Sequence, residues 1–277
     1  MTPRLLLALL ILPAGGYAQQ RSGKAPRPTI PVVVELFTSE GCSSCPAADD
    51  LLARLDTRGR IPRNIEIIAL GEHVDYWDNL GWKDSFSSPL FSTRQQDYGI
   101  AFHNSTVYTP QAVINGHKEV LGSDSQALLR AVTEASYLPR AEVEMQLASP
   151  DTVQLRVGRL PVGSNRSDVL LAIAESGIET DVKAGENNGR RLKHTAVVRM
   201  MSKLAELDPA HPGEYQAEAR LNLRPEWQRA NMKLVLLVQD RETRRIWGAA
   251  SAWLEAKAPG SRTRPESRGL SGLTQTR

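Results

Sequence analysis

The chain has 277 residues, enough for one large domain or two of ordinary size, and its 41% hydrophobic and 23% charged residues are typical of a globular protein. The formal net charge is +3, and no basic cluster with interleaved aromatic residues occurs. The composition therefore argues against a nucleic-acid partner.

The N-terminus has the pattern of a secretory signal peptide, which we assign to residues 1–18. Arg4 supplies a positive charge, residues 5–12 are apolar without interruption, and Ala18 is a small residue at the expected cleavage point. The apolar run is far shorter than the ~20 residues that a spanning helix needs, so we expect no stable membrane span. We therefore expect an exported protein, periplasmic or secreted, with a flexible leader over residues 19–30.

Three elements are predicted after the leader. Residues 32–37 are a run of apolar and β-branched residues, which is typical of a buried strand. From Pro46 onward apolar residues recur at helical spacing, with Asp49 on the opposite, polar face, and Pro62 ends the pattern. Residues 65–70 indicate a second buried strand.

A long polar and aromatic stretch, residues 73–104, comes next and has a helical pattern after Pro89. Residues 112–114 and 119–121 are predicted to pair as a hairpin, because the Asn-Gly dipeptide between them is a strong turn signal. This order of elements predicts a small mixed α/β fold over residues 31–138.

A last helix, capped by Ser123 or Ser125, closes this fold. Beyond it, short segments of alternating apolar and polar residues are separated by turn signals, as in an antiparallel β-sandwich. We therefore predict an all-β, sandwich-like domain over residues 139–255. Residues 256–277 are basic and poor in hydrophobic residues, which predicts a disordered tail.

The only two cysteines, Cys42 and Cys45, are separated by two serines. A disulfide across so short a loop removes little entropy from the unfolded chain, so reactivity explains the pair better than stability does. Between a strand and a helix that starts near Pro46, Cys42 would lie at a helix N-terminus, where backbone N–H groups favour its thiolate. Ser43 and Ser44 can offer further donors and are candidates for substrate contact.

The Cys42-x-x-Cys45 motif after a buried strand, and Tyr108-Thr109-Pro110 before a strand and hairpin, resemble the thioredoxin superfamily. The resemblance implies a thioredoxin-like domain in which Pro110 is cis and faces the disulfide. It also implies that Thr109 and Tyr108 help to bind an extended substrate chain. The redox-active disulfide itself then takes the place of a cofactor.

More narrowly, the chain resembles a family of exported bacterial proteins of unknown function with a thioredoxin-like domain. The Cys-to-Pro spacing is longer than in thioredoxin, which implies an insertion across residues 73–104. The matching segments are residues 34–46, 73–78, 81–84, 94–95 and 108–110, with residues 185–187, 189–190 and His194 in the second half.

Further residues are candidates for the site. Glu35 resembles the buried acid of thioredoxins that relays a proton for the second cysteine, although a strand-end glutamate in water is equally compatible. His73 is a candidate substrate contact or proton donor, against a hydrogen-bonded structural role. Trp77 could line a groove for the substrate chain or pack the insertion. Arg94 is expected to pair with Asp75, Asp78 or Asp84.

These observations predict an exported thiol–disulfide oxidoreductase that acts on a disulfide-containing protein or a small thiol and is recycled by a separate redox partner. Cys42 attacks or is attacked, and Cys45 resolves the mixed disulfide. Glu40, Asp49 and Asp50 flank the pair without a nearby cation, which disfavours the thiolate. We therefore expect a reductase or isomerase rather than a strong oxidase.

Two alternatives stay open on sequence alone. A copper- or metal-handling protein could bind Cu(I) through Cys42, Cys45 and a histidine such as His73 or His103, since soft thiolates suit that ion. A non-catalytic envelope protein could instead dock a partner through its β-sandwich, because that fold hosts many functions.

Overall fold

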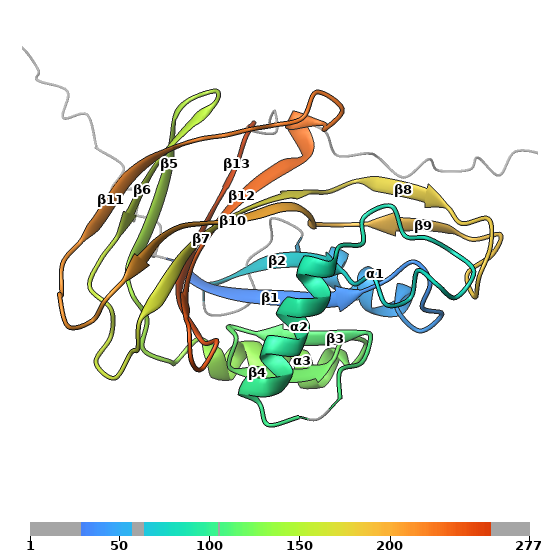
Figure 1. Ribbon diagram of the computed structural model, residues 1–277, viewed down its shortest axis with the longest axis horizontal. Helices are drawn as coiled ribbons and strands as arrows, with labels where there is room; N and C mark the ends of the chain where they lie inside the picture. The colour runs from blue at the N-terminus through green and yellow to red at the C-terminus, as the bar shows by residue number, and fades with distance from the viewer. Residues whose placement is uncertain (1–28, 57–63, 105, 256–277) are drawn as a thin grey trace, which may run out of the picture.

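The computed structural model describes residues 29–56, 64–104 and 106–255 (Figure 1). The predicted signal peptide, nearly all of the predicted leader and the predicted tail lie outside these residues, so they stay predictions. Within the described ranges, no helix is long and apolar enough to cross a membrane.

The first half has the predicted order of strands and helices. β1 and β2 are longer than predicted and pair in parallel as far as Thr38 and His73, beside the turn that carries the cysteines. The elements are β1 (Ile30–Thr38), α1 (Pro46–Leu55), β2 (Ile65–His73), α2 (Pro89–Ala101), β3 (Gln111–Ile114), β4 (Lys118–Leu121) and α3 (Ser125–Ala135).

The cap of α3 differs from the prediction. Asp124, and neither Ser123 nor Ser125, is the N-cap, and its carboxylate accepts a hydrogen bond from the Ala127 N–H at 2.9 Å. Serine and aspartate are almost equally good N-caps, so residue preference alone could not choose among three neighbouring candidates.

The second half is built from β-strands and one short 3-10 helix. Its elements are β5 (Val143–Ser149), β6 (Thr152–Val157), β7 (Ser167–Glu175), β8 (Ile178–Asp181), β9 (Arg191–His194), β10 (Val197–Leu207), β11 (Tyr215–Arg220), η1 (Arg229–Asn231), β12 (Met232–Asp240) and β13 (Ile246–Trp253).

One mixed sheet of eight strands runs through both halves, in the order β13-β12-β7-β10-β2-β1-β3-β4. The halves join where β10 pairs with β2 at Val197 and Gly71, and the Gly71 N–H donates to Ala196 O at 2.7 Å. Gly71 fits this junction because a Cβ there would lie 3.2 Å from Thr195 O. The molecule is thus an α/β fold in which the second half extends the sheet of the first.

A second layer covers the far part of that sheet. The three-stranded antiparallel sheet β11-β6-β5 packs its apolar face on β7, β12 and β13 (Figure 1). The buried cluster between the layers includes Val153, Leu155, Leu171, Leu234 and Leu236. The predicted sandwich packing is therefore present, but one of its layers belongs to the sheet shared with the first half.

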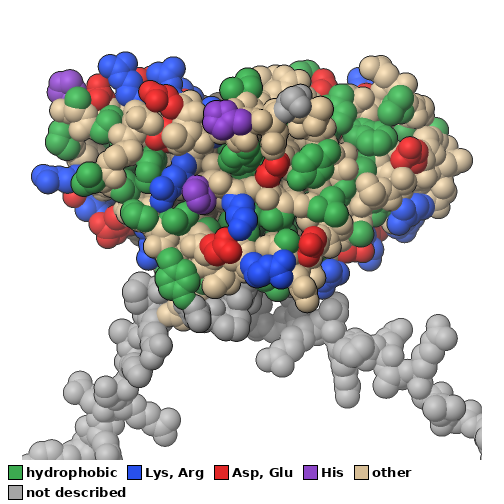
Figure 2. Space-filling model, turned by 90° about the horizontal axis from the view of Figure 1, so that it is seen from below, with side chains coloured by type: hydrophobic (Ala, Val, Ile, Leu, Met, Phe, Trp, Pro, Cys, Tyr) green, Lys and Arg blue, Asp and Glu red, His purple; other side chains and the backbone are tan. Residues whose placement is uncertain are grey.

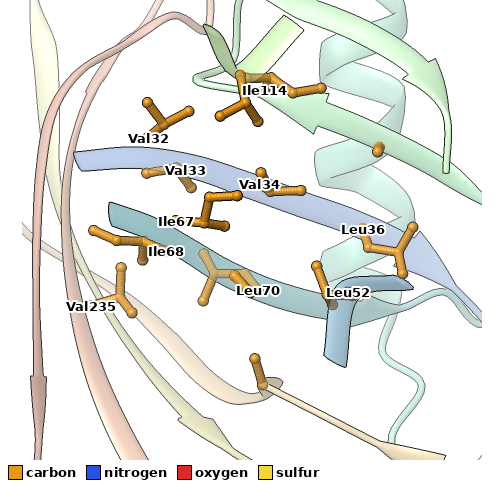
Figure 3. Packing of buried hydrophobic residues seen from close by; sticks show 14 of the residues in the cluster. Val32, Val33, Val34, Leu36, Leu52, Ile67, Ile68, Leu70, Ile114 and Val235 are labelled. Carbon is orange, nitrogen blue, oxygen red and sulfur yellow. The ribbon is translucent and has the colours of Figure 1, made fainter. Parts of the chain in front are cut away.

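The alternation of side chains along β1 decides which groups meet around the site. Val32, Val34 and Leu36 belong to the cluster that includes Leu52 of α1 (Figure 3). Because successive side chains of a strand point to opposite faces, Glu35 and Phe37 face the other side, toward α2. Figure 2 shows another view, in which acidic and basic side chains are interspersed with hydrophobic ones.

β8 and β9 form a separate two-stranded hairpin that extends past α1, away from the large sheet (Figure 1). The loop between them, residues 182–190, turns at Gly185 and Gly189, both with positive φ. This hairpin brings a segment of the second half to the cysteine turn of the first.

Candidate redox site

Cys42 and Cys45 form a disulfide in the turn from β1 to α1, with their Cα atoms 5.4 Å apart. The Cys42 N–H donates to Ser39 O, and the Cys45 N–H donates to Cys42 O, both at 3.2 Å. α1 starts directly after Cys45 with Pro46, whose missing N–H would have had no intrahelical partner in the first turn. The structure thus places the pair at a helix N-terminus, as the sequence predicted.

The disulfide lies below the surface, whereas the residues between its cysteines do not. Cys42 and Cys45 are both 0% exposed, and Ser43 and Ser44 are exposed. Ser44 Oγ lies 3.3 Å from Cys42 Sγ, within hydrogen-bonding distance of sulfur. The Ser43 N–H donates at 3.0 Å to the carboxylate of Glu186. The serines therefore form the outer surface over a covered disulfide.

The Thr109-Pro110 peptide bond is cis, which confirms that part of the expectation for Pro110. That Pro110 faces the disulfide stays a prediction. Trp77 connects this peptide to the cysteine turn, because its Nε1 donates to Thr109 Oγ1 at 2.9 Å and its Cβ lies beside Gly41. A Cβ on Gly41 would lie 3.2 Å from Trp77 Cβ, so a larger residue there would displace the indole.

Tyr108 lies at the rim of this region and is 37% exposed. Its backbone carbonyl accepts a hydrogen bond from Gln95 Nε2 at 2.7 Å, which ties it to α2. Burial, with help from the Glu119 carboxylate, raises the pKa of Tyr108 to about 12, so its phenol is neutral at physiological pH. Tyr108, Thr109 and Trp77 are thus adjacent, as the candidate substrate contacts were expected to be.

His73 is buried and paired rather than open to a substrate. It is 2% exposed, and its Nδ1 lies 2.7 Å from Asp84 Oδ2. Burial opposes the protonation of His73, but the Asp84 carboxylate outweighs this and raises the pKa of the imidazole. Burial would likewise raise the pKa of Asp84, and the facing His73 lowers it below its ordinary value.

A second buried pair of a histidine and a carboxylate lies next to the first. His194 Nε2 lies 3.0 Å from Glu40 Oε1, and Trp82 Nε1 donates to Glu40 Oε2 at 2.8 Å. The rings of His73 and His194 are 5.1 Å apart. His194 Nδ1 is buried without a hydrogen-bond partner. Because Glu40 precedes Cys42 by two residues, these groups form a buried polar cluster under the cysteine turn.

Asp49 belongs to this cluster, although its spacing had suggested the outer face of the helix. It follows Cys45 by one turn of α1, and its N–H donates to Cys45 O at 3.0 Å. Burial raises the pKa of Asp49 to about 6, against the opposing effect of His73 and His194. The sequence analysis had named Asp49 as one of the acidic residues that flank the cysteine pair but had placed it on the polar face of the helix. The i to i+4 spacing from Cys45 was the signal for its place near the site.

Glu35 lies on the opposite face of the sheet from α1. Its carboxylate accepts hydrogen bonds from Arg94 Nε at 2.7 Å and from the Tyr98 hydroxyl at 2.5 Å. Glu72 is 3.4 Å from the same guanidinium. Burial and the neighbouring Glu35 raise the pKa of Glu72 well above its usual range. Among the described residues, no contact supports the proton-relay role expected for Glu35.

The expected partners of Arg94 were wrong. Arg94 is 4% exposed and pairs with Glu35 and Glu72 from the strands, rather than with an aspartate of the insertion. Its Nη1 also donates to Gln239 Oε1 of β12 at 2.8 Å. A partner on a neighbouring strand is invisible to sequence spacing, which explains the error.

A loop of the second half binds the cysteine turn directly. Asn187 is 0% exposed, and its Nδ2 donates to Glu40 O at 2.8 Å and to Cys42 O at 3.0 Å. Arg190 Nη1 donates to Asn187 Oδ1 at 2.8 Å and fixes the orientation of the amide. The sequence analysis had associated this segment with the family resemblance, but not with the site.

No group of three or more His, Cys, Asp or Glu side chains within the described ranges is arranged to hold a metal ion. The two cysteine sulfurs are joined to each other. His73 is engaged by Asp84.

A disulfide at the start of α1, a parallel β1-α1-β2 unit and a cis Thr109-Pro110 bond define a thioredoxin-like protein. A family model described as "Protein of unknown function (DUF1223)" matches residues 33–239, so the chain belongs to this family.

Solved structures support this assignment. Protein AGR_C_4864 from Agrobacterium tumefaciens is 26% identical and superposes with a TM-score of 0.65, over 84% of this chain and 98% of that one. HBP35 of Porphyromonas gingivalis is 14% identical, with a TM-score of 0.59 over 89% of this chain and 82% of that one, and shows a likeness of fold. No curated protein matches the chain.

Proposed function

We propose that this protein is an exported thiol–disulfide oxidoreductase that reduces or isomerises disulfides of partner proteins in the periplasm or outside the cell. The observation that carries the proposal is the Cys42–Cys45 disulfide at the N-terminus of α1, in a chain whose Thr109-Pro110 bond is cis and is linked to the cysteine turn through Trp77. Exposed amide groups at a helix N-terminus stabilise a thiolate, which is the reactive form of cysteine.

The reaction follows the two steps of thiol–disulfide exchange. In the reduced protein, the Cys42 thiolate attacks a partner disulfide, which forms a mixed disulfide and releases one partner thiolate. The Cys45 thiolate then attacks Cys42 Sγ, which restores the Cys42–Cys45 disulfide and releases the second partner thiolate. Two electrons pass to the partner, and each released thiolate takes up a proton. A separate thiol donor returns the pair to the dithiol.

The Glu186 carboxylate beside the turn favours the reducing direction. It accepts the Ser43 N–H, whereas Glu40 and Asp49 beneath the turn face His194 and His73, which offset part of their charge. Nearby negative charge makes a thiolate less stable, and a pair with a less stable thiolate is a weaker oxidant. A partner chain then lies over the exposed Ser43 and Ser44, and we expect it to reach the exposed Tyr108.

The halves have different roles in this proposal. Residues 31–138 form the thioredoxin-like half that carries the chemistry, and residues 139–255 form the sandwich-like half that braces it. The packing of β5, β6 and β11 on the shared sheet, and the contact of residues 186–187 with the cysteine turn, support this division.

The proposal is tested by turnover of a protein disulfide with the purified mature protein and an excess of a small thiol. We expect Cys42→Ser and Cys45→Ser each to remove turnover, with Cys45→Ser accumulating a mixed disulfide through Cys42. Arg130→Met, at an exposed position of α3, is the control and should retain turnover. Equal turnover by wild type and Cys42→Ser would contradict the proposal.

A further inference from the structure

Thiol–disulfide exchange needs an open line of approach to the sulfur that is attacked, because the incoming sulfur aligns with the breaking S–S bond. Cys42 and Cys45 are both 0% exposed in this structure. If the pair reacts with a partner, as proposed above, the cover over the turn must move. The segments in contact with the turn are the candidates for that cover.

Among the residues that contact the turn, Asn187 has the best-defined hydrogen bonds. Its side-chain amide donates to the carbonyl oxygens of Glu40 and Cys42, residues that lie 147 and 145 positions earlier. Arg190 holds the amide oxygen, so all three polar contacts fix a single orientation. A fully buried amide that satisfies two turn carbonyls holds the backbone of the cysteine turn in one shape.

Glu186, the preceding residue, acts on reactivity. Its carboxylate is exposed and accepts the Ser43 N–H at 3.0 Å, and the hydrogen bonds from Ser43 lower the pKa of Glu186, so it is ionised at neutral pH. The Ser43 N–H directly follows Cys42 and is one of the donors that could stabilise its thiolate. Glu186 both occupies this donor and adds negative charge, and both effects disfavour the thiolate.

The segment that carries these residues continues β7 and β10 beyond the end of the main sheet. β8 and β9 pair with each other and with no strand of the eight-stranded sheet. Each has four residues; positions along β8 alternate between half-buried and exposed, and positions along β9 alternate between exposed and buried. A two-stranded hairpin is only marginally stable by itself, so the position of β8–β9 depends on the His194–Glu40 contact in β9 and on the contacts at its loop. Figure 1 shows the hairpin extending beside α1.

We propose that the β8–β9 loop is a removable clamp that holds the Cys42–Cys45 turn closed and weakly reactive, with Asn187 and Glu186 as its positioning residues. A partner that displaces the loop frees the Ser43 N–H and opens the approach to Cys42 Sγ. The second half of the chain would then control a reaction carried out by the first. This inference rests on the proposed function.

The first experiment measures the rate at which dithiothreitol reduces the disulfide of the folded mature protein. We expect Asn187→Ala to raise this rate about tenfold, the factor that corresponds to a hydrogen bond of typical net strength. The matched control is Asn188→Ala, because Asn188 is the adjacent, exposed asparagine of the same loop. Its rate should stay within about twofold of wild type, the effect of an ordinary surface substitution.

The second experiment removes the charge of Glu186 without changing the size of its side chain. Glu186→Gln keeps the side-chain size and should lower the pKa of the reduced Cys42 thiol, read from thiolate absorbance, and raise the rate of reaction of that thiol. Glu179→Gln is the control, because Glu179 is an exposed carboxylate on β8 of the same hairpin. Glu186 is exposed, so this variant tests the clamp even if Asn187→Ala unfolds.

The outcomes separate the two proposals. A wild-type pair that does not exchange with thiols would remove the proposed function. A wild-type pair that does exchange, with Asn187→Ala and Glu186→Gln matching their controls in rate and in thiol pKa, would overturn the clamp alone. A faster Asn187→Ala variant that is still folded at the assay temperature, together with the Glu186→Gln shift, would establish it.

Discussion

Asp49 shares its face of α1 with Cys45, and its carboxyl lies among buried histidines. Its pKa is about 6 in the folded protein, above the ordinary ~3.9 of an unfolded chain. The folded state therefore binds this proton more tightly than the unfolded state does. The stabilisation from Asp49 is fully present below pH ~4 and is lost as the pH rises through about 6.

The first prediction follows from this titration. Asp49→Asn should be more stable than wild type at pH 7.5, and its advantage should shrink as the pH falls toward 4, because the asparagine does not ionise. Thermal unfolding of both proteins across this range measures the difference. Asp50→Asn, an exposed neighbour on α1, is the control and should show no such trend. An Asp49→Asn advantage that does not vary with pH would contradict the assignment.

Arg94 pairs with the buried carboxylates Glu35 and Glu72. Removing one partner of a buried ion pair leaves charge without compensation and costs about 3–5 kcal/mol. We predict a loss of this size in the free energy of unfolding for Arg94→Met, measured in denaturant. Arg130→Met, at an exposed position of α3, should stay near wild type. Equal stability of the two variants would show that Arg94 is not needed to compensate the charge of Glu35 and Glu72.

Local patterns identified some site residues and could not identify others. Cys42, Cys45 and Pro110 were predictable because a short motif and its place between elements define them. Asn187 and the partners of Arg94 were not, because their contacts join residues that lie far apart in the sequence. Periodicity places a residue on a face of an element, but it does not say what covers that face.

Among the elements, α3 gives a direct test of which local signal begins a helix. Asp124 caps it, although two serines flank that position. We predict that Asp124→Ala lowers the free energy of unfolding by about 1 kcal/mol, since the Ala127 N–H loses its acceptor. Ser123→Ala is the control and should be close to neutral. A larger loss for Ser123→Ala would place the cap at the serine instead.

At the scale of the whole molecule, strand pairing is the feature that the sequence left open. Alternation predicted the strands of the second half, but it does not specify their neighbours, and four of them continue the sheet of the first half. Contacts between side chains also cross the halves: Arg94 with Gln239, and Lys233 with Asp56 at 2.5 Å. The predicted boundary at residues 138–139 therefore separates two parts of the chain whose strands belong to one sheet.

A shared sheet should make the two halves unfold together, because unfolding of one half would leave an unpaired strand edge on the half that stays folded. We predict a single calorimetric transition for the mature protein, with equal calorimetric and van't Hoff enthalpies. Two separate transitions would show that the junction of β2 with β10 contributes little to stability.

The central claim concerns the Cys42–Cys45 pair, and its equilibrium reduction potential is the most direct test. The mature protein would be equilibrated with dithiothreitol or glutathione buffers, and its free thiols would be counted. We predict a reversible two-electron couple within the range of working oxidoreductases, about −280 to −120 mV, and in the more reducing half of it. A pair that cannot be cycled between dithiol and disulfide in the folded protein would contradict the account.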